Sequence, residues 1–173
     1  MKNEIIFLIV GILIGSIITM MIISNKETTE IETIFSPQEG NKILEQIRSA
    51  NQSIEIEMFV FSSQEIYEEL IRAKDRGVII RVILEKRDSG GSNERMVEKL
   101  RENEIDARFA TYEYKLTHAK IIIIDGKIVV VGSHNLTKPA LNENREASVI
   151  IKDQIIASAF RFEFEKDFLR SWN

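Results

Sequence analysis

The order of apolar and polar residues along this chain follows two different periods. Runs rich in β-branched residues indicate strands, which we expect at residues 53–61, 78–84, 105–111, 118–124, 127–131 and 146–151. Apolar residues that return every three or four positions indicate helices, which we expect at residues 36–49, at 62–76, around 96–100 and at 156–168. Because strands alternate with helices, the pattern predicts an α/β sandwich.

Two of the expected helices begin with capping sequences. Ser36 and Glu39 form a capping box with Pro37 at the first helical position. Ser62 and Glu65 form a second capping box, and the glycine at position 77 supplies a left-handed stop. The side chains that the four helices are expected to bury are Ile43, Leu44, Ile47, Ile66, Leu70, Ile71, Met96, Val97, Leu100, Ile156, Phe160, Phe164 and Phe168.

The N-terminal segment shows neither period. Its nineteen residues 5–23 contain no charged side chain. As a helix they would extend about 28 Å, enough to cross the hydrocarbon core of a bilayer. We therefore expect a transmembrane anchor at residues 1–24, a polar linker at 25–35 and a globular domain at 36–173. A cleaved signal peptide is the alternative, although residues 21–24, MIIS, lack the small residues of a cleavage site.

Flanking charges give this segment an expected orientation. Lys2 and the terminal amine lie on one side and Lys26 on the other, so a slight excess places the N-terminus in the cytoplasm. The domain would then lie on the outer side of a single-pass membrane protein, in the periplasm or the extracellular space. Gly11 and Gly15 have the GxxxG spacing through which two membrane helices pack. The absence of cysteine from the sequence fits either compartment.

The candidate chemistry begins at His118. His118 and Lys120 are two positions apart at the start of a strand, so both side chains project from the same face. Asp125 and Gly126 are the two-residue signal for a tight hairpin turn, after which the chain returns antiparallel. An imidazole and an ammonium are therefore expected to share one pocket.

The returning strand ends at residues 132–135, GSHN. A glycine at position 132 would allow the backbone to approach a ligand closely. Ser133 and Asn135 add neutral hydrogen-bond donors beside the face of His118 and Lys120. Such a pocket suits a phosphate.

The spacing of these residues resembles the HxKxxxxD and GSxN signature of the phospholipase D superfamily without a gap. Six identities are fixed, and at about one in twenty each they would coincide by chance on the order of once in 10^8 start positions. The resemblance covers most of residues 36–170 and includes a single copy of the motif. It implies a phospholipase D-like sandwich with a mixed central sheet flanked by helices. It also implies the small single-motif branch, typified by bacterial endonucleases and membrane-anchored relatives, whose active site is built across a homodimer.

The resemblance further implies catalytic roles for His118, Lys120, Asp125 and Glu146. His118 would attack a phosphodiester to form a phosphohistidine, and His118 of the partner subunit would protonate the leaving oxygen. Glu146 would accept the other imidazole proton, although a carboxylate at the head of an apolar strand also simply marks a strand end. Asp125 lies past the hairpin bend, so we interpret it as a turn and network residue that the motif requires.

The same resemblance assigns the non-bridging phosphate oxygens to Lys120, Ser133 and Asn135. His134 falls at a variable position, either as a further phosphate contact or as an ordinary rim residue. The segment with Tyr112, Tyr114 and Lys115 would either stack a base and hold a phosphate or form a solvated loop, and the loop is our preferred interpretation. Phe59 and Phe61 are expected to be core residues rather than a stacking platform.

Neither a metal nor another cofactor is expected. The sequence has two histidines, no cysteine and no tight acidic cluster, whereas divalent-metal hydrolases need several converging ligands. We expect a phosphodiesterase, with a metal-independent endonuclease for DNA or RNA as the first hypothesis. A phospholipase D that hydrolyses cardiolipin-type or other phospholipids is the alternative, and a non-catalytic nucleic-acid-binding scaffold is the third.

The charge balance leaves the choice of substrate open. The formal net charge is −4, whereas a nuclease normally carries basic residues that neutralise phosphates. A local basic cleft is compatible with this balance. The residues expected to line it are Lys86, Arg87, Lys115, Lys120 and Arg145.

Overall fold

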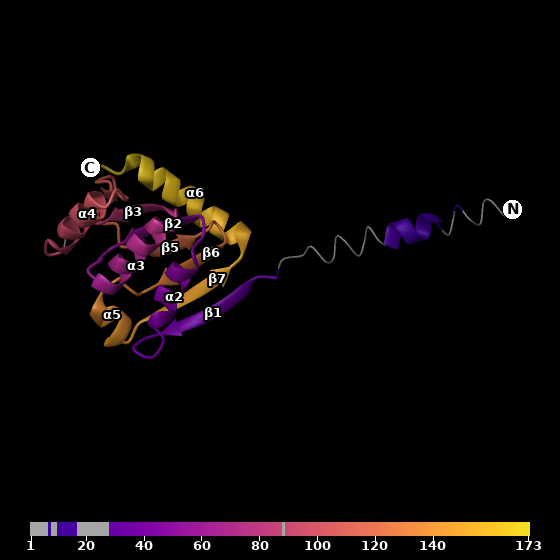
Figure 1. The fold of residues 1–173 in the computed structure, drawn as a ribbon, viewed down its shortest axis with the longest axis horizontal. Coiled ribbons are helices and arrows are strands. Elements are labelled where there is room, and N and C mark those ends of the chain that lie inside the picture. Colours follow the sequence, from indigo (N-terminus) through magenta and orange to yellow (C-terminus); the bar gives the residue numbers. More distant parts are fainter. Residues whose placement is uncertain (1–6, 8–9, 17–27, 88) are drawn as a thin grey trace.

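The computed structural model describes residues 7, 10–16, 28–87 and 89–173. Within them one seven-stranded sheet has the order β1-β7-β6-β5-β2-β3-β4 (Figure 1). The strands are β1 (Glu30–Phe35), β2 (Ser53–Met58), β3 (Ile79–Leu84), β4 (Asp106–Phe109), β5 (Lys120–Ile124), β6 (Ile128–Gly132) and β7 (Ala147–Lys152). Strands β2, β3 and β4 are parallel and the other pairs are antiparallel, which confirms the mixed sheet.

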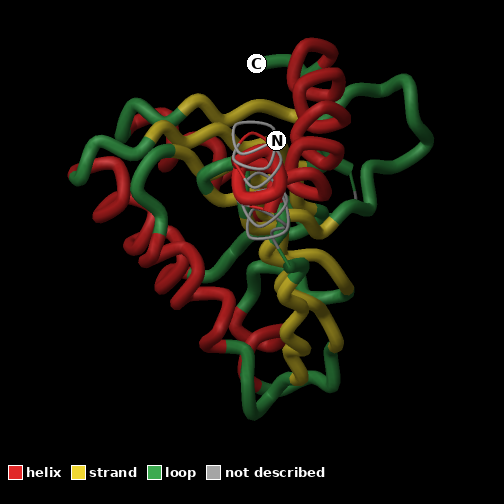
Figure 2. The backbone as a smooth tube through the Cα atoms, turned by 90° about the vertical axis from the view of Figure 1, so that its right-hand side faces the viewer, coloured by secondary structure: helices red, strands yellow, loops and turns green. Residues whose placement is uncertain are grey.

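Helices cover both faces of this sheet, as Figure 2 shows. They are α2 (Asn41–Ser49), α3 (Gln64–Asp75), α4 (Ser92–Glu102), α5 (Lys138–Asn142) and α6 (Gln154–Arg170). Apolar residues of α2, α3, α4 and α5 share the main hydrophobic core with one face of the sheet. Helix α6 lies on the other face over a smaller core. The α/β sandwich predicted from the sequence is therefore confirmed.

Side chains of the central strand β2 alternate between these two faces. Ile54, Ile56 and Met58 enter the main core, whereas Glu55 and Glu57 face α6. On the neighbouring strand β5, Lys120 points to the same side as Ile122 and Ile124 of the main core, and Ile121 points toward α6. Lys120 thus lies on the face opposite α6, and the same alternation places His118 there.

Residues 30–35, predicted to be part of the linker, form the edge strand β1, so that prediction was wrong. Every residue from Glu30 to Phe35 pairs with β7 in antiparallel register. Only Ile34 of this strand is fully buried. A strand at a sheet edge that buries one side chain leaves almost no hydrophobic pattern in the sequence.

The first helix begins later than its capping sequence predicted, at Asn41 rather than Ser36. The Ser36 hydroxyl donates to the carbonyl oxygen of Asn144 at 2.7 Å and accepts from the amide of Glu146 at 3.1 Å. The Glu39 carboxylate accepts from the amide of Phe35 at 2.9 Å. The capping residues therefore stabilise the turn that follows β1 and its contact with the start of β7.

Other sequence predictions hold with small shifts. The N-cap of α3 is Ser63, which accepts from the amide of Ile66, instead of Ser62. Gly77 has a φ of +89° and ends α3 as expected. Most of the predicted helical core residues are buried, whereas three are only half-buried: Ile71, Ile156 and Phe160.

The hairpin between β5 and β6 has the predicted two-residue turn, with φ of 54° at Asp125 and 60° at Gly126. The predicted membrane segment is not described in full, because residues 5–6, 8–9 and 17–23 lie outside the described residues. In the ranges that are described, no helix is both long and apolar enough to cross a bilayer. The membrane anchor and its orientation stay predictions.

Candidate active site

His118 and Lys120 are in contact at the start of β5. The Lys120 ammonium lies 3.2 Å from Nδ1 and 3.3 Å from Nε2 of the imidazole, and it donates to the His118 carbonyl oxygen at 3.0 Å. The imidazole packs on the ring of Phe59, with 4.4 Å between ring centroids, and the ammonium lies 5.1 Å from the same ring. The expected imidazole and ammonium pair is present, and Phe59, predicted to be a core residue, supports both groups.

A fully buried asparagine on α4 holds the backbone beneath this pair. The Asn93 amide donates to the carbonyl oxygens of Phe59 at 2.7 Å and Glu85 at 2.6 Å, and its oxygen accepts from the amide of Phe61 at 2.9 Å. The chain after β2 and the chain after β3 are thereby fixed to one side chain. The sequence did not reveal the role of Asn93, because an asparagine near the start of a helix is usually interpreted as an N-cap residue.

The segment that leads into His118 is fixed by a buried ion pair. The Glu85 carboxylate binds the guanidinium of Arg87 at 2.7 Å and accepts from the amide of Thr117 at 2.7 Å. Arg87 also donates to the carbonyl oxygens of Tyr114 and Lys115. Burial alone would raise the pKa of Glu85, but these hydrogen bonds hold it below its ordinary value.

Ser133 and Glu146 form the other half of the site. The Ser133 hydroxyl donates to the Glu146 carboxylate at 2.5 Å and accepts from the amide of Ala147 at 3.0 Å. The side-chain amide of Asn144 donates to the other carboxylate oxygen at 3.3 Å. Ile121 pairs with Val131 across the hairpin, so residues 132 and 133 follow directly beside Lys120.

The two remaining motif positions, Asn135 and Gly132, have structural partners. The Asn135 side-chain oxygen accepts from the amide of Val60 at 3.1 Å, which leaves its amide nitrogen as the donor for a phosphate. A Cβ atom at Gly132 would lie 2.4 Å from the Cα atom of Ser148. The glycine is therefore required for pairing with β7, and the expected close approach to a ligand stays a prediction.

His134 is buried, which excludes the alternative of an ordinary rim residue, and the other alternative, a further phosphate contact, stays a prediction. Only 3% of its surface is exposed, and Nδ1 lies 2.7 Å from the Ser148 hydroxyl. Burial lowers the pKa of His134 below its ordinary value, although the charge of Glu146 opposes this effect. The imidazole is therefore held mainly neutral behind the site.

Glu146 also acts on Lys120 through its charge. Burial lowers the pKa of Lys120 from its ordinary value, and the nearby carboxylate of Glu146 partly reverses that effect. The hydrogen-bond partners of the Glu146 carboxylate in the described part of the chain are Ser133 and Asn144, and His118 is not among them. The role of Glu146 as the residue that orients His118 stays a prediction.

Asp125, counted among the catalytic residues, lies at the far end of β5 from Lys120. Five residues of strand separate the two positions by roughly 16 Å. The carboxylate accepts from the backbone amides of Asn51, Gln52 and Ser53 at 2.7 to 3.1 Å. This distance argues against contact between Asp125 and a phosphate bound at Lys120, and these hydrogen bonds fit the interpretation as a turn and network residue.

Among the residues proposed for a basic cleft, Arg87 has its charge balanced by Glu85. Lys86 lies over the rings of Phe109 and Trp172 and Arg145 lies over the Phe35 ring, and both keep their positive charge in contact with a neutral ring. Lys115 is exposed and Lys120 lies at the site. The basic cleft stays a prediction.

No group of three or more His, Asp or Glu side chains able to hold a metal ion occurs in the part of the chain that the structure describes. The donors that converge on the site are an imidazole, an ammonium, a hydroxyl and an amide. These groups bind and polarise a phosphate through hydrogen bonds and charge.

Known proteins share this sequence pattern and fold. The protein family described as "Cardiolipin synthase, PLD-like domain" matches residues 43–168. A phospholipase D from Rickettsia prowazekii is 32% identical over 140 residues, which are 80% of this chain and 67% of that protein. A mitochondrial cardiolipin hydrolase from Danio rerio is 30% identical over 136 residues, which are 79% of this chain and 57% of that protein.

A crystal structure supports the same relationship. The phospholipase D family member Nuc from Salmonella typhimurium superimposes with a TM-score of 0.78 and 26% identity, over 83% of this chain and 97% of Nuc. NucT from Helicobacter pylori has the same fold, with a TM-score of 0.74 at 20% identity, over 84% of this chain and 99% of NucT. The chain thus spans nearly all of these two compact proteins, but only part of the length of the rickettsial and zebrafish relatives.

Proposed function

Since this chain belongs to the phospholipase D superfamily of phosphodiester hydrolases, we propose that it is an endonuclease that cleaves DNA or RNA through a phosphohistidine, without a metal. The observation that carries the chemistry is the contact of the Lys120 ammonium with the His118 imidazole, at 3.2 and 3.3 Å. It places a nucleophile beside a cation that neutralises phosphate. Phe59 fixes both groups from below.

The first chemical step is attack on phosphorus. A ring nitrogen of His118 forms a P–N bond while the bond from phosphorus to the leaving oxygen breaks. The leaving oxygen takes its proton from His118 of the partner subunit. Lys120 and the side-chain amide of Asn135 stabilise the charge on the non-bridging oxygens.

The second step returns the enzyme to its starting state. Water forms a new P–O bond as the P–N bond breaks, and its proton passes to His118 of the partner subunit. The sum is hydrolysis of one phosphodiester by one water. The Ser133 hydroxyl exchanges its hydrogen bond to Glu146 for one to the phosphate. The Glu146 side chain then stays in place behind the site.

The second histidine has to come from another copy, because the other histidine of the chain, His134, is buried against Ser148. Helix α6 exposes large apolar side chains at seven-residue intervals, with Ile155 83%, Phe162 65% and Leu169 82% exposed. This stripe lies on the face of the sheet opposite His118, so the two copies in the proposed homodimer share the active site through another surface.

Nucleic acid is the favoured substrate because of the loop before His118. Tyr112 and Tyr114 are 59% and 44% exposed, and Arg87 fixes the loop through the carbonyl oxygens of residues 114 and 115. Tyr112 already stacks on Trp172, with ring centroids 5.5 Å apart, and Arg87 lies over its ring at 5.0 Å. Tyr114 is therefore the aromatic ring of this loop that is available to stack a base. Lys115 on the same loop is available to a backbone phosphate.

A phospholipase is the second candidate, since the rickettsial relative is named phospholipase D and the zebrafish relative a cardiolipin hydrolase. An anchor at residues 5–23, with the domain on the outer side of the membrane, would bring the site to a lipid surface. A scaffold without catalysis is the third candidate. The contact between His118 and Lys120 argues against it, because a binding scaffold has no need of a nucleophile.

The test is hydrolysis by the full chain of plasmid DNA, of RNA and of anionic vesicles that contain cardiolipin, each in excess EDTA. We expect the nucleic acids to be cut and the vesicles to be left intact. Cleavage of cardiolipin alone would establish the phospholipase. Activity that disappears in EDTA and returns with Mg²⁺ would contradict the metal-free mechanism.

A further inference from the structure

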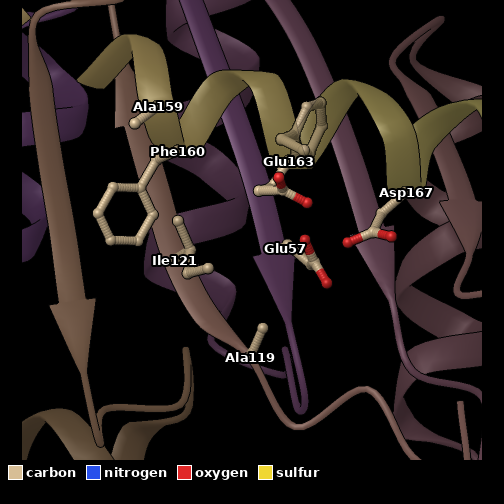
Figure 3. Close-up of a pocket in the computed structure, with 8 residues that line it drawn as sticks. Glu57, Ala119, Ile121, Ala159, Phe160, Glu163 and Asp167 are labelled. Atoms are coloured by element: carbon tan, nitrogen blue, oxygen red, sulfur yellow. The ribbon is translucent and has the colours of Figure 1, made fainter. Parts of the chain in front are cut away.

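A cavity lies on the face of the sheet opposite His118, between α6 and strands β2 and β5. Its volume is about 450 Å³, within the range of sites that bind small molecules. Figure 3 shows one wall formed by Ala119, Ile121 and Phe160 and the other by three carboxylates. The cavity is thus apolar on one side and acidic on the other.

The carboxylates are Glu57 of β2 and Glu163 and Asp167 of α6. Two of them have partners, because Glu163 binds Lys166 at 2.6 Å and Asp167 accepts from the Tyr114 hydroxyl at 3.3 Å. Glu57 is only 7% exposed, and no hydrogen bond or ion pair to it occurs among the described residues. Figure 3 shows its carboxylate at the cavity, beside the other two.

The neighbouring carboxylate on the same strand shows that an unpaired Glu57 is unusual. Glu55 faces α6 as well, and it binds Arg81 at 3.2 Å and Arg161 at 3.4 Å. A buried carboxylate without a cation is costly, because burial removes the water that would solvate its charge. Burial raises the pKa of Glu57 to about 7, with the charge of Asp167 adding to the effect.

We propose that this cavity binds a small organic molecule with a primary ammonium group and an apolar body. The ammonium would pair with Glu57 and the body would lie against Ile121 and Phe160. A metal ion fits less well, since the three carboxylates do not form a metal-binding group in the described part of the chain. An anion is excluded by the charge of the lining.

A ligand bound in this cavity would influence the active site through the backbone of β5. Ala119 lines the cavity and lies between His118 and Lys120 in the sequence, while its carbonyl oxygen accepts from the amide of Phe59 at 2.9 Å. The bound molecule therefore contacts the back of the strand whose front carries the catalytic pair. Binding itself does not depend on the proposed nuclease activity.

The experiment is isothermal titration of the full chain with benzylammonium chloride at pH 8, with benzyl alcohol as the neutral analogue. We expect saturable binding of the cation with a Kd below roughly 1 mM, and affinity for the alcohol at least about tenfold weaker. Glu57→Gln should weaken binding of the cation at least about tenfold. The exposed carboxylate Glu45 provides the control, because Glu45→Gln should leave the affinity unchanged.

A second variant tests the cavity without touching its charge. Ala159→Phe places a ring in the cavity and should abolish binding while Glu57 stays in place. Equal affinity for cation and alcohol, or full affinity in either variant, would overturn the proposal. So would the absence of saturable binding to the wild-type chain, or a Glu57→Gln variant that changes only the monomer–dimer equilibrium, since the cavity would then be filled by a second copy.

Discussion

The side-chain amide of Asn93 donates a 2.7 Å hydrogen bond to the carbonyl oxygen of Phe59, the residue on which the His118 imidazole packs. The start of α4 is thus connected to the catalytic histidine through a single intermediate residue. Asn93 does not touch the histidine itself. It is a positioning residue, and its removal should affect both folding and the placement of the imidazole.

Asn93→Ala should lower the free energy of unfolding by about 3 kcal/mol, because it leaves three buried backbone groups without a partner. Denaturant unfolding measures this loss, and the NMR signals of the His118 ring report its displacement. Asn103, at the other end of α4, is half-buried and bonds to Tyr67 and Lys99. Asn103→Ala should cost less than about 1 kcal/mol, and equal losses in the two variants would contradict the assigned role.

Asp125→Ala should separate stability from chemistry. The carboxylate holds three backbone amides at the start of β2, so its loss should reduce stability by about 2 kcal/mol. The turnover number per folded molecule should stay within about twofold of wild type, because the residue lies far from the reacting phosphate. A loss of turnover near 10³-fold in a folded variant, as expected for a group in contact with the phosphate, would show that Asp125 takes part directly.

The sequence predicted the strands and helices of the core well, because each buries a regular set of apolar residues. The HxK spacing likewise predicted the contact between His118 and Lys120, since alternate residues of a strand share a face. Edge strand β1 was missed because one buried residue, Ile34, gives no pattern. The capping box at Ser36 misled for a different reason, because the Ser36 hydroxyl binds Asn144 and Glu146, more than a hundred positions away.

Support from distant residues could not be predicted from sequence patterns. Asn93 contacts backbone groups that are 8 and 34 positions away, and only the folded chain brings them together. The contacts of Lys86 and Arg145 with aromatic rings on other elements likewise could not be predicted from composition.

The stability of the protein should depend on pH through Glu57. Its pKa is raised to about 7 from an ordinary value of 4.5, chiefly by burial. Between these values the folded chain holds a proton that the unfolded chain has released, so stability falls as the pH rises through this window. The difference corresponds to about 3 kcal/mol at pH 8.

Urea unfolding at pH 5 and pH 8 measures this dependence. Glu57→Gln keeps a neutral side chain at both values, so it should lose less stability than wild type between them. The exposed variant Glu45→Gln should follow the wild-type profile. If Glu57→Gln and wild type lose the same amount, the buried carboxyl does not titrate in this range.

Disruption of the apolar stripe on α6 should leave the catalytic dimer intact, because the stripe lies on the face of the sheet opposite His118. Phe162→Asp places a charge at a 65% exposed position, so the fold should be kept and the dimer dissociation constant should stay within about threefold of wild type. Sedimentation over a dilution series measures this constant. Phe162→Leu retains an apolar side chain and should stay dimeric.

Activity should fall with the dimer fraction in the same series, because each reaction needs two copies of His118. Full specific activity in a species shown to be monomeric would contradict the proposed shared site. A monomeric Phe162→Asp variant would instead show that the two copies meet through α6, which would contradict the shared site.

The phosphohistidine is the central claim, and rapid quenching of turnover with a labelled phosphodiester, followed by mass spectrometry, tests it most directly. We expect an acid-labile phosphoryl group on His118 of the wild-type chain. His118→Ala should fold, carry no label and lose at least about 10³-fold in turnover. Turnover without any adduct, together with more than about a tenth of the activity in folded His118→Ala, would contradict the mechanism.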